Sequence, residues 1–225
     1  MACDLVVYGA GGMGQEIVDL VHCPRAGGPV WNLIGFVDDD AALHGTEVFG
    51  LPVLGGFDWL ATRTVAVSVA LGAPAARRRA AMALAATAGA SSRGRPPSPV
   101  LVHPAAYVGE GADLGEGTVV AAHATLTADV RIGRFAIVNA GATVSHNARL
   151  RDFATVAPGA HLAGAVRLGE GADVGIGASV VQGRAVGEWS VVGAGAVVIV
   201  DAAPNTTVVG CPARVVAERP PGWHE

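Results

Sequence analysis

The chain has 225 residues, of which 51% are hydrophobic and only 15% are charged, and its formal net charge is −4. A chain of this length can bury one large core or two smaller ones, and its acidic balance gives no support for nucleic-acid binding. No apolar run reaches the ~18 residues of a transmembrane helix, and the N-terminus shows no secretory leader. Cys3, Cys23 and Cys211 are odd in number and far apart, as expected of unpaired thiols in a reducing compartment. We therefore expect a cytoplasmic protein that binds neither nucleic acid nor membrane.

The first ninety residues alternate between strand and helix patterns. Residues 3–8 predict a buried strand, and a G-x-G-x-x-G turn starting at Gly9 then leads into a helical run. Such a turn presents backbone N–H groups to an anion. A second predicted strand ends in the acidic run 38–40, and a third ends at Gly72 before another helix. This β-α-β-β-α order predicts a small Rossmann-like domain over residues 1–90, half of a dinucleotide fold.

Two other interpretations of this region stay open. A tight strand-to-helix turn uses the same glycines without binding a nucleotide. An NAD-dependent oxidoreductase needs an acidic residue about 20 positions further on, which Asp38 roughly provides, and a second mononucleotide-binding half. That half is missing, so a mononucleotide fits better than NAD. The arginines of 77–79 are expected on a solvated helix face, and residues 91–99, rich in Ser, Pro and Gly, predict a linker.

A six-residue repeat fills the rest of the chain. Every sixth residue from Val108 to Val198 is aliphatic, and a small residue usually stands two positions earlier. This spacing matches neither a helix nor a flat strand. Over residues 100–225 it predicts a parallel β-helix of about five three-sided coils, with the aliphatic residues filling the core. Glycines that follow the aliphatic positions, such as Gly115 and Gly169, are expected to give the turns conformational freedom. A purely structural solenoid would show the same repeat.

Both halves in this order resemble the sugar O-acyl/N-acyltransferase family of left-handed β-helix proteins. The family includes sialic acid O-acetyltransferases and N-acetyltransferases of nucleotide-linked 4-amino-sugars. The resemblance covers nearly the whole chain and rests on the segments YGAGGMGQEIVDL, GFVDDD, GLPVLG, LVHPAA, VNAGATVSHNARLRDFATVAPGAHLAG and VVGCPARVV. It implies a left-handed β-helix and a homotrimer with active sites between subunits. The implied activity is acyl-CoA-dependent N-acylation of a nucleotide-linked amino sugar, with acetyl-CoA as co-substrate.

The resemblance also implies roles for single residues. Within the segment from Asn139 to His146, His146 is the implied general base and Asn139 an active-site residue. An imidazole titrates near neutral pH, so it can take a proton from the sugar amine while the amine attacks the thioester directly. The implied contacts to the nucleotide-linked sugar are Gly11, Gly12, Met13, Asp38, Asp39 and Gly72, and those to coenzyme A are Thr155, Ile176 and Ala194.

Three positions depart from the family pattern. Asn147 stands where an Asp or Glu commonly follows the base, while Thr155 and Met13 each replace a histidine. Asn147 is thus a candidate catalytic position at which the base has lost its charged partner, unless another group orients it. These departures leave open an O-acetyltransferase and a non-catalytic nucleotide-sugar-binding trimer. The histidines are too scattered in the sequence to predict a metal site.

Overall fold

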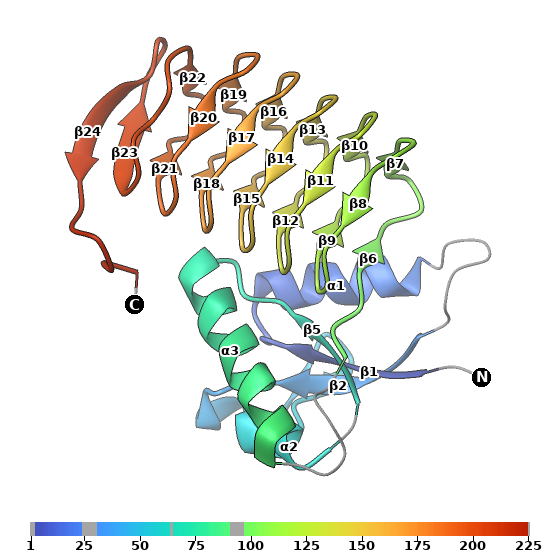
Figure 1. Ribbon diagram of the computed structural model, residues 1–225. Coiled ribbons are helices and arrows are strands. Elements are labelled where there is room, and N and C mark those ends of the chain that lie inside the picture. Colours follow the sequence, from blue (N-terminus) through green and yellow to red (C-terminus); the bar gives the residue numbers. More distant parts are fainter. Residues whose placement is uncertain (1–2, 24–30, 64, 91–96, 225) are drawn as a thin grey trace. The chain divides into compact units, whose positions relative to one another are not determined.

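The computed structural model describes residues 3–23, 31–63, 65–90 and 97–224 (Figure 1). The chain divides into two compact units, Met1–Pro104 and Ala105–Glu225. Residues 91–96 of the predicted linker lie outside the described residues, and residues 97–99 have no regular secondary structure.

The first unit is built on a three-stranded parallel sheet with strand order β2-β1-β5. The central strand is buried from Leu5 to Tyr8, because these residues are apolar or aromatic and strands pair with both of its sides. The elements of this unit are β1 (Cys3–Tyr8), α1 (Gly12–His22), β2 (Trp31–Val37), a 3-10 helix (Ala41–Leu43), β3 (Glu47–Val48), β4 (Leu51–Pro52), α2 (Phe57–Ala61), β5 (Ala66–Val69), α3 (Pro74–Ala90) and β6 (Leu101–Val102). The predicted order of strands and helices is confirmed, with the hairpin β3–β4 and α2 inserted before β5.

Arg77, near the start of α3, contradicts the expected solvated arginine face. Only 1% of the residue is exposed, and its Nη1 donates hydrogen bonds to the carbonyl oxygens of Leu71 and Gly72 at 3.0 and 2.6 Å. Burial of this charge is tolerated because the guanidinium satisfies carbonyl groups of the loop after β5. Arg79, two residues further on, is exposed.

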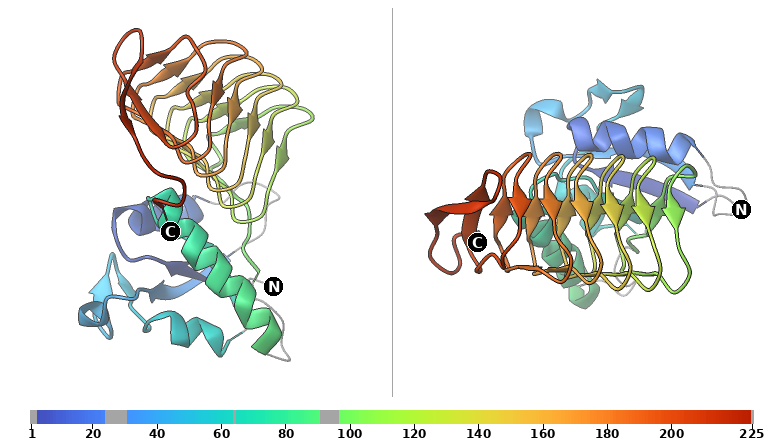
Figure 2. Two further views of the ribbon diagram at one scale, coloured as in Figure 1. Left: turned by 60° about the vertical axis from the view of Figure 1, so that its left-hand side comes forward. Right: turned by 90° about the horizontal axis from the view of Figure 1, so that it is seen from above.

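The second unit is a parallel β-helix with three faces. Its successive coils lie side by side in the right-hand view of Figure 2. Face I consists of β7 (Tyr107–Val108), β10 (Thr125–Leu126), β13 (Thr143–Val144), β16 (His161–Leu162), β19 (Ser179–Val180) and β22 (Val197–Val198). Face II consists of β8 (Asp113–Leu114), β11 (Arg131–Ile132), β14 (Arg149–Leu150), β17 (Arg167–Leu168) and β20 (Ala185–Val186). Face III contains β9 (Val119–Val120), β12 (Ile137–Val138), β15 (Thr155–Val156), β18 (Asp173–Val174), β21 (Val191–Val192) and β23 (Thr206–Val209), and β24 (Arg214–Glu218) pairs antiparallel with β23.

One coil of this helix consists of three hexapeptides. Strands of the same face therefore pair in parallel one coil apart, as Thr125 does with Thr143 and Thr143 with His161. The aliphatic residues of the repeat stack in the interior, where Leu126 and Leu162 are at most 1% exposed. Most of the small residues two positions earlier are buried as well, among them Ala124 and Ala160 at 0% exposure. The predicted fold class, a Rossmann-like domain followed by a β-helix of hexapeptide repeats, is confirmed.

The glycines after the aliphatic residues do not have the expected role. Gly115 and Gly169 lack a positive φ, but a Cβ on Gly169 would lie 2.4 Å from the backbone nitrogen of Glu188 in the next coil. Glycine is needed there because successive coils approach closely, not because the turn is strained. The left-handed conformation occurs instead at every sixth residue from Gly111 to Gly195, three positions after the aliphatic residue.

Candidate active site

The three edges of the β-helix differ in chemistry. The residue two positions after each inward aliphatic residue lies at an edge, in the turn between two faces. The edge between faces II and III, here called the charged edge, carries Glu116, Arg134, Asp152, Glu170 and Glu188. The edge between faces III and I, here called the apolar edge, carries Ala122, Ala140, Pro158, Ile176 and Ala194. The edge between faces I and II, here called the His146 edge, carries Glu110, Ala128, His146, Gly164, Gln182 and Val200.

His146 lies in the turn that follows β13, with an exposed side chain. Its ring covers Gly164, the equivalent residue of the next coil: a Cβ on Gly164 would lie 2.5 Å from His146 Cε1 and 2.6 Å from Nε2. The backbone of the two turns is joined by a hydrogen bond from Ala165 N to His146 O at 2.8 Å. The position of the imidazole therefore depends on the absence of a side chain at Gly164.

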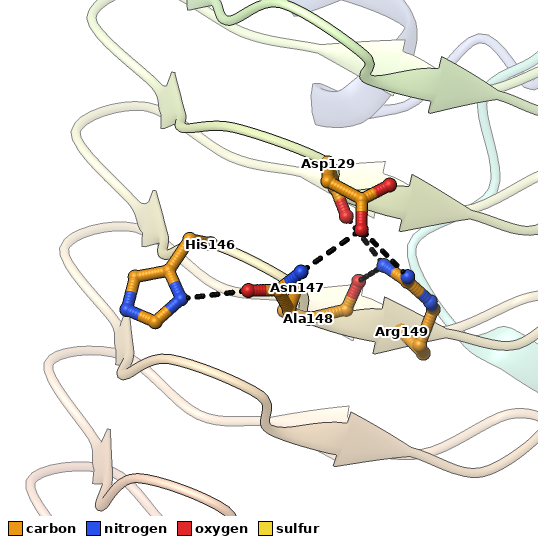
Figure 3. Close-up of polar contacts among 5 residues, drawn as sticks. All are labelled: Asp129, His146, Asn147, Ala148 and Arg149. Atoms are coloured by element: carbon orange, nitrogen blue, oxygen red, sulfur yellow. Dashed lines mark hydrogen bonds and ion pairs between the residues drawn. The ribbon is translucent and has the colours of Figure 1, made fainter.

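Asn147 links His146 to a carboxylate on the preceding coil (Figure 3). The distance from His146 Nδ1 to Asn147 Oδ1 is 2.9 Å, and Asn147 Nδ2 donates to Asp129 Oδ2 at 2.9 Å. Arg149 forms an ion pair with the same carboxylate oxygen at 3.0 Å, and its Nη1 donates to the Asp129 carbonyl oxygen. The hydrogen bonds from Arg149 and then from Asn147 hold the pKa of Asp129 below its ordinary value.

The other residues implied to act in catalysis or coenzyme A binding lie elsewhere on the coil. Asn139 is in the turn after β12, next to the apolar edge, and Ile176 and Ala194 belong to that edge. Ile176 is 63% exposed although its side chain is wholly apolar. Thr155 is the outward-facing residue of β15 on face III and is 7% exposed. Within one chain, face I thus separates Asn139, Ile176 and Ala194 from His146 and Asn147.

The glycines of the glycine-rich turn have different surroundings: Gly14 is packed closely, whereas Gly11 and Gly12 are exposed. A Cβ on Gly14 would lie 2.1 Å from the carbonyl oxygen of Gly9, so α1 packs directly against the end of β1. Gly11 and Gly12 are exposed, and a Cβ added at either would have no atom within 4 Å. Gly11 is the N-cap of α1 and no side chain caps the helix. Together with Met13 in its first turn, this leaves a helix N-terminus open to an anion.

Two acidic residues after β2, Asp38 and Asp39, accept hydrogen bonds from other groups of the first unit. Asp38 accepts from the backbone nitrogens of Ala10 at 2.8 Å and Asp40 at 2.9 Å. Asp39 accepts from the Tyr8 hydroxyl at 2.6 Å and from Phe57 N at 3.1 Å. Both carboxylates thus fix the glycine turn and its neighbouring loops.

A hollow lies beside these carboxylates. It has a volume of about 500 Å³ and is lined by Tyr8, Asp39, Phe57, Leu71, Ala76, Arg79, Ala80 and Ala83. Of the residues implied to contact the sugar nucleotide, only Asp39 lines it. Gly72 is bonded through its carbonyl oxygen to Arg77. Burial and the Asp39 hydrogen bond raise the pKa of Tyr8 above its ordinary value, so its hydroxyl remains a donor.

Sequence reasoning missed Asp129 and Gly164. Asp129 stands 18 residues before Asn147, which is one coil, and Gly164 stands one coil after His146. The coil period would have identified Asp129 as a neighbour of Asn147 and Gly164 as a neighbour of His146. Within the described residues, no group of three or more His, Cys, Asp or Glu side chains is arranged to hold a metal ion. None of the helices seen in the described part of the chain is long and apolar enough to cross a membrane.

Substitution of Gly164 by alanine is expected to displace the His146 ring and to lower turnover about tenfold or more. The methyl group would overlap the ring edge that carries Nε2, and a displacement of about 1 Å in a catalytic group is enough for such a loss. Steady-state kinetics checks this. Gln182→Ala, which alters the equivalent edge residue one coil beyond Gly164, is the matched control and should keep the rate. Unchanged turnover in Gly164→Ala would show that the ring position is not critical.

Comparisons with known proteins identify a family model and several solved structures that are similar to this chain. The PglD N-terminal domain model matches residues 4–84. A mutant of GDP-perosamine N-acetyltransferase from Caulobacter crescentus, in complex with CoA and GDP-perosamine, is 30% identical over 96% of this chain and 97% of that chain, with a TM-score of 0.84. The acetyltransferase domain of PglB from Neisseria gonorrhoeae FA1090, in complex with acetyl coenzyme A, is 34% identical over 96% of this chain and 100% of that chain, with a TM-score of 0.85. WeeI from Acinetobacter baumannii AYE is 28% identical over 94% and 99% of the two chains, with a TM-score of 0.81.

No curated protein matches the chain significantly. Two of the solved structures nevertheless cover 96% of this chain, with identities of 30% and 34% over nearly their whole length. The predicted left-handed form of the β-helix is confirmed by this likeness. The chain belongs to the sugar O-acyl/N-acyltransferase family of left-handed β-helix proteins that its motifs resemble.

Proposed function

We propose that the protein is an N-acetyltransferase that transfers the acetyl group of acetyl-CoA to the amino group of a nucleotide-linked amino sugar. The observation that carries the proposal is the combination of His146, held by a hydrogen-bonded network at one edge, with full-length likeness to structures that bind CoA, acetyl-CoA and GDP-perosamine. A non-catalytic sugar-nucleotide-binding protein would have no need of an oriented imidazole. An NAD-dependent oxidoreductase is disfavoured because the described sheet of the first unit has only three strands.

The reaction follows from these residues. The sugar amine attacks the thioester carbonyl carbon, a C–N bond forms, and the negative charge passes to the carbonyl oxygen. His146 Nε2 takes the proton that the amine loses, because Nδ1 is engaged with Asn147. The C–S bond then breaks, coenzyme A leaves as a thiolate that is protonated to the thiol, and the sugar carries an amide. A thioester has a good leaving group, so one positioned base suffices and no covalent enzyme intermediate is required.

We propose that the working form is a homotrimer whose sites lie between copies. Asn139, Ile176 and Ala194 lie at or beside the apolar edge, and His146 lies on another edge of the same chain. A site that contains both groups forms when the apolar edge of one copy meets the His146 edge of the next. The exposure of the apolar Ile176 side chain in a single copy also supports an apolar edge that another copy covers. Analytical ultracentrifugation should give about three times the 22.5 kDa chain mass, and a monomer at working concentration would contradict the shared site.

Acceptor-dependent thiol release from acetyl-CoA tests the activity. The panel consists of GDP-, UDP- and dTDP-linked 4-amino-sugars, each with a matched sugar nucleotide that carries a hydroxyl in place of the amine. We expect release only with an amine, and product mass larger by one acetyl group. Equal release with the hydroxyl analogue would make the protein an O-acetyltransferase. Coenzyme A binding without release from any acceptor would favour the non-catalytic binding protein.

The described thiols fit a cytoplasmic location. All three cysteines are free, and Cys3 and Cys211 are exposed. Exposed unpaired thiols persist in reducing compartments, so we propose that the protein acts in the cytoplasm.

A further inference from the structure

The turns that hold Asp129 and Asn147 occupy the same position on successive coils. Both residues adopt the left-handed conformation, with φ of 53° and 61°, and Asn147 N donates to Ala128 O at 3.1 Å. This backbone bond sets the two side chains one above the other on the His146 edge. Their contact is therefore a product of the coil stacking, and it places a carboxylate within reach of the Asn147 amide.

The Asn147 amide has one orientation that satisfies both of its neighbours. An ionised carboxylate only accepts hydrogen bonds, so the NH₂ group must face Asp129. The amide oxygen then faces His146 Nδ1, and an amide oxygen also only accepts. His146 Nδ1 must consequently carry the proton, which leaves Nε2 free of one. The opposite amide orientation would set its oxygen against the Asp129 carboxylate and turn the NH₂ group towards Nδ1, and Nε2 would then carry the proton.

Arg149 keeps Asp129 in the form that this arrangement needs. Its guanidinium contacts both the carboxylate and the carbonyl oxygen of Asp129, and it also donates to Ala148 O at 3.2 Å. Arg149 thus holds the carboxylate in place through Oδ2, the same oxygen to which Asn147 donates, and favours its ionised form. Among the described residues, Arg149 and Asn147 donate hydrogen bonds to the Asp129 carboxylate, and Arg131 adds a weaker electrostatic attraction.

We propose that Asp129 is a positioning residue that acts through Asn147 to fix the Nδ1–H tautomer of His146 and so leave Nε2 able to accept a proton. The carboxylate that commonly follows the base in this family is replaced by an amide whose orientation is set by a carboxylate one coil away. The use of Nε2 in catalysis rests on the proposed function, whereas the tautomer is a property of the resting protein.

The first test is the tautomer of His146 by ¹⁵N NMR of the imidazole in the full-length protein, without substrates and at a pH where the ring is neutral. We expect the wild type to show the Nδ1–H form and Asp129→Asn to show a mixture or the Nε2–H form. Asn suits this position because it tolerates the left-handed backbone, as Asn147 does. Arg167→Gln, which alters the outward residue one coil after Arg149, is the control and should keep the wild-type tautomer. A wild-type spectrum in Asp129→Asn would overturn the proposal.

The second test is kinetic. Asp129→Asn should lower kcat about 10-fold to 100-fold, as loss of an orienting partner does elsewhere, with a smaller change in KM. Asn147→Asp alone should gain nothing, because it sets two carboxylates against each other. In the Asp129→Asn background the same change should restore both the Nδ1–H tautomer and most of the activity. Failure of this rescue, with the tautomer unchanged, would contradict the role of Asp129. A tautomer that responds as expected in a protein without activity on any acceptor would overturn the proposed function and leave the positioning role standing.

Discussion

Replacement of His146 by alanine is expected to lower acceptor-dependent thiol release by about 100-fold to 10,000-fold, the range that a general base commonly contributes. The sugar amine must lose a proton as it attacks the thioester, and in the proposed mechanism His146 Nε2 accepts it. Because the side chain is exposed, its removal should leave folding intact. The measurement is kcat with saturating acetyl-CoA and the best acceptor of the panel.

His161 provides a matched control for this experiment. It is also an exposed histidine of the β-helix, on β16 of face I, where its Nδ1 lies 3.0 Å from Thr143 Oγ1. His161→Ala should keep wild-type turnover. A rate in His146→Ala close to that of the wild type would assign the base to another group. An equal loss of turnover in both variants would show that the loss is not specific to His146.

Substitution of Gly175 by asparagine is expected to destabilise the β-helix by about 3 kcal/mol, the upper end of ordinary overpacking. A Cβ on Gly175 would lie 2.6 Å from Val192 O and 2.8 Å from Ala194 N. Both atoms belong to the backbone of the next coil, which cannot move without breaking its own ladder. Thermal or denaturant unfolding at fixed protein concentration measures the loss.

Gly177, two residues away in the same coil, is the control. It has a φ of +65°, and a Cβ added there would have no atom within 4 Å. Asparagine tolerates the left-handed conformation, so Gly177→Asn should change stability by less than about 1 kcal/mol. If both variants unfolded alike, backbone conformation rather than coil contact would explain the glycines of the repeat.

The fold could be predicted from the sequence because both of its signals are local. A period of six with inward aliphatic residues has few structural solutions, and the strand-turn-helix pattern of the first ninety residues is contiguous. The role of Gly169 could not be predicted, because it depends on a residue far away in the sequence. Its constraint comes from Glu188 in the next coil, and a local pattern does not reveal which backbone atoms approach from outside. The burial of Arg77 could not be predicted for the same reason, because it depends on carbonyl groups of the loop after β5.

The sequence motif names candidate residues for the site but does not reveal how they are arranged. The motif identifies His146 and Asn147, yet it suggests that the base has lost a charged partner. The structure places Asp129 within reach of Asn147, through a contact that spans 18 residues and requires two left-handed turns in register. The division of the implied residues between two edges could not be read from the chain either, because it depends on which strands share a face.

The coil of three hexapeptides also limits how a gene of this kind can change in length. Insertion or deletion of three consecutive hexapeptides in the β-helix would add or remove one whole coil and leave every later residue on its original edge. Insertion of a single hexapeptide would keep the repeat intact but rotate everything after it by one face. Such an insertion between Asp129 and Asn147 would thus carry His146 to a neighbouring edge and break its link to the carboxylate. Length variation among active relatives should therefore occur in whole coils within this region, even though the visible repeat is three times shorter.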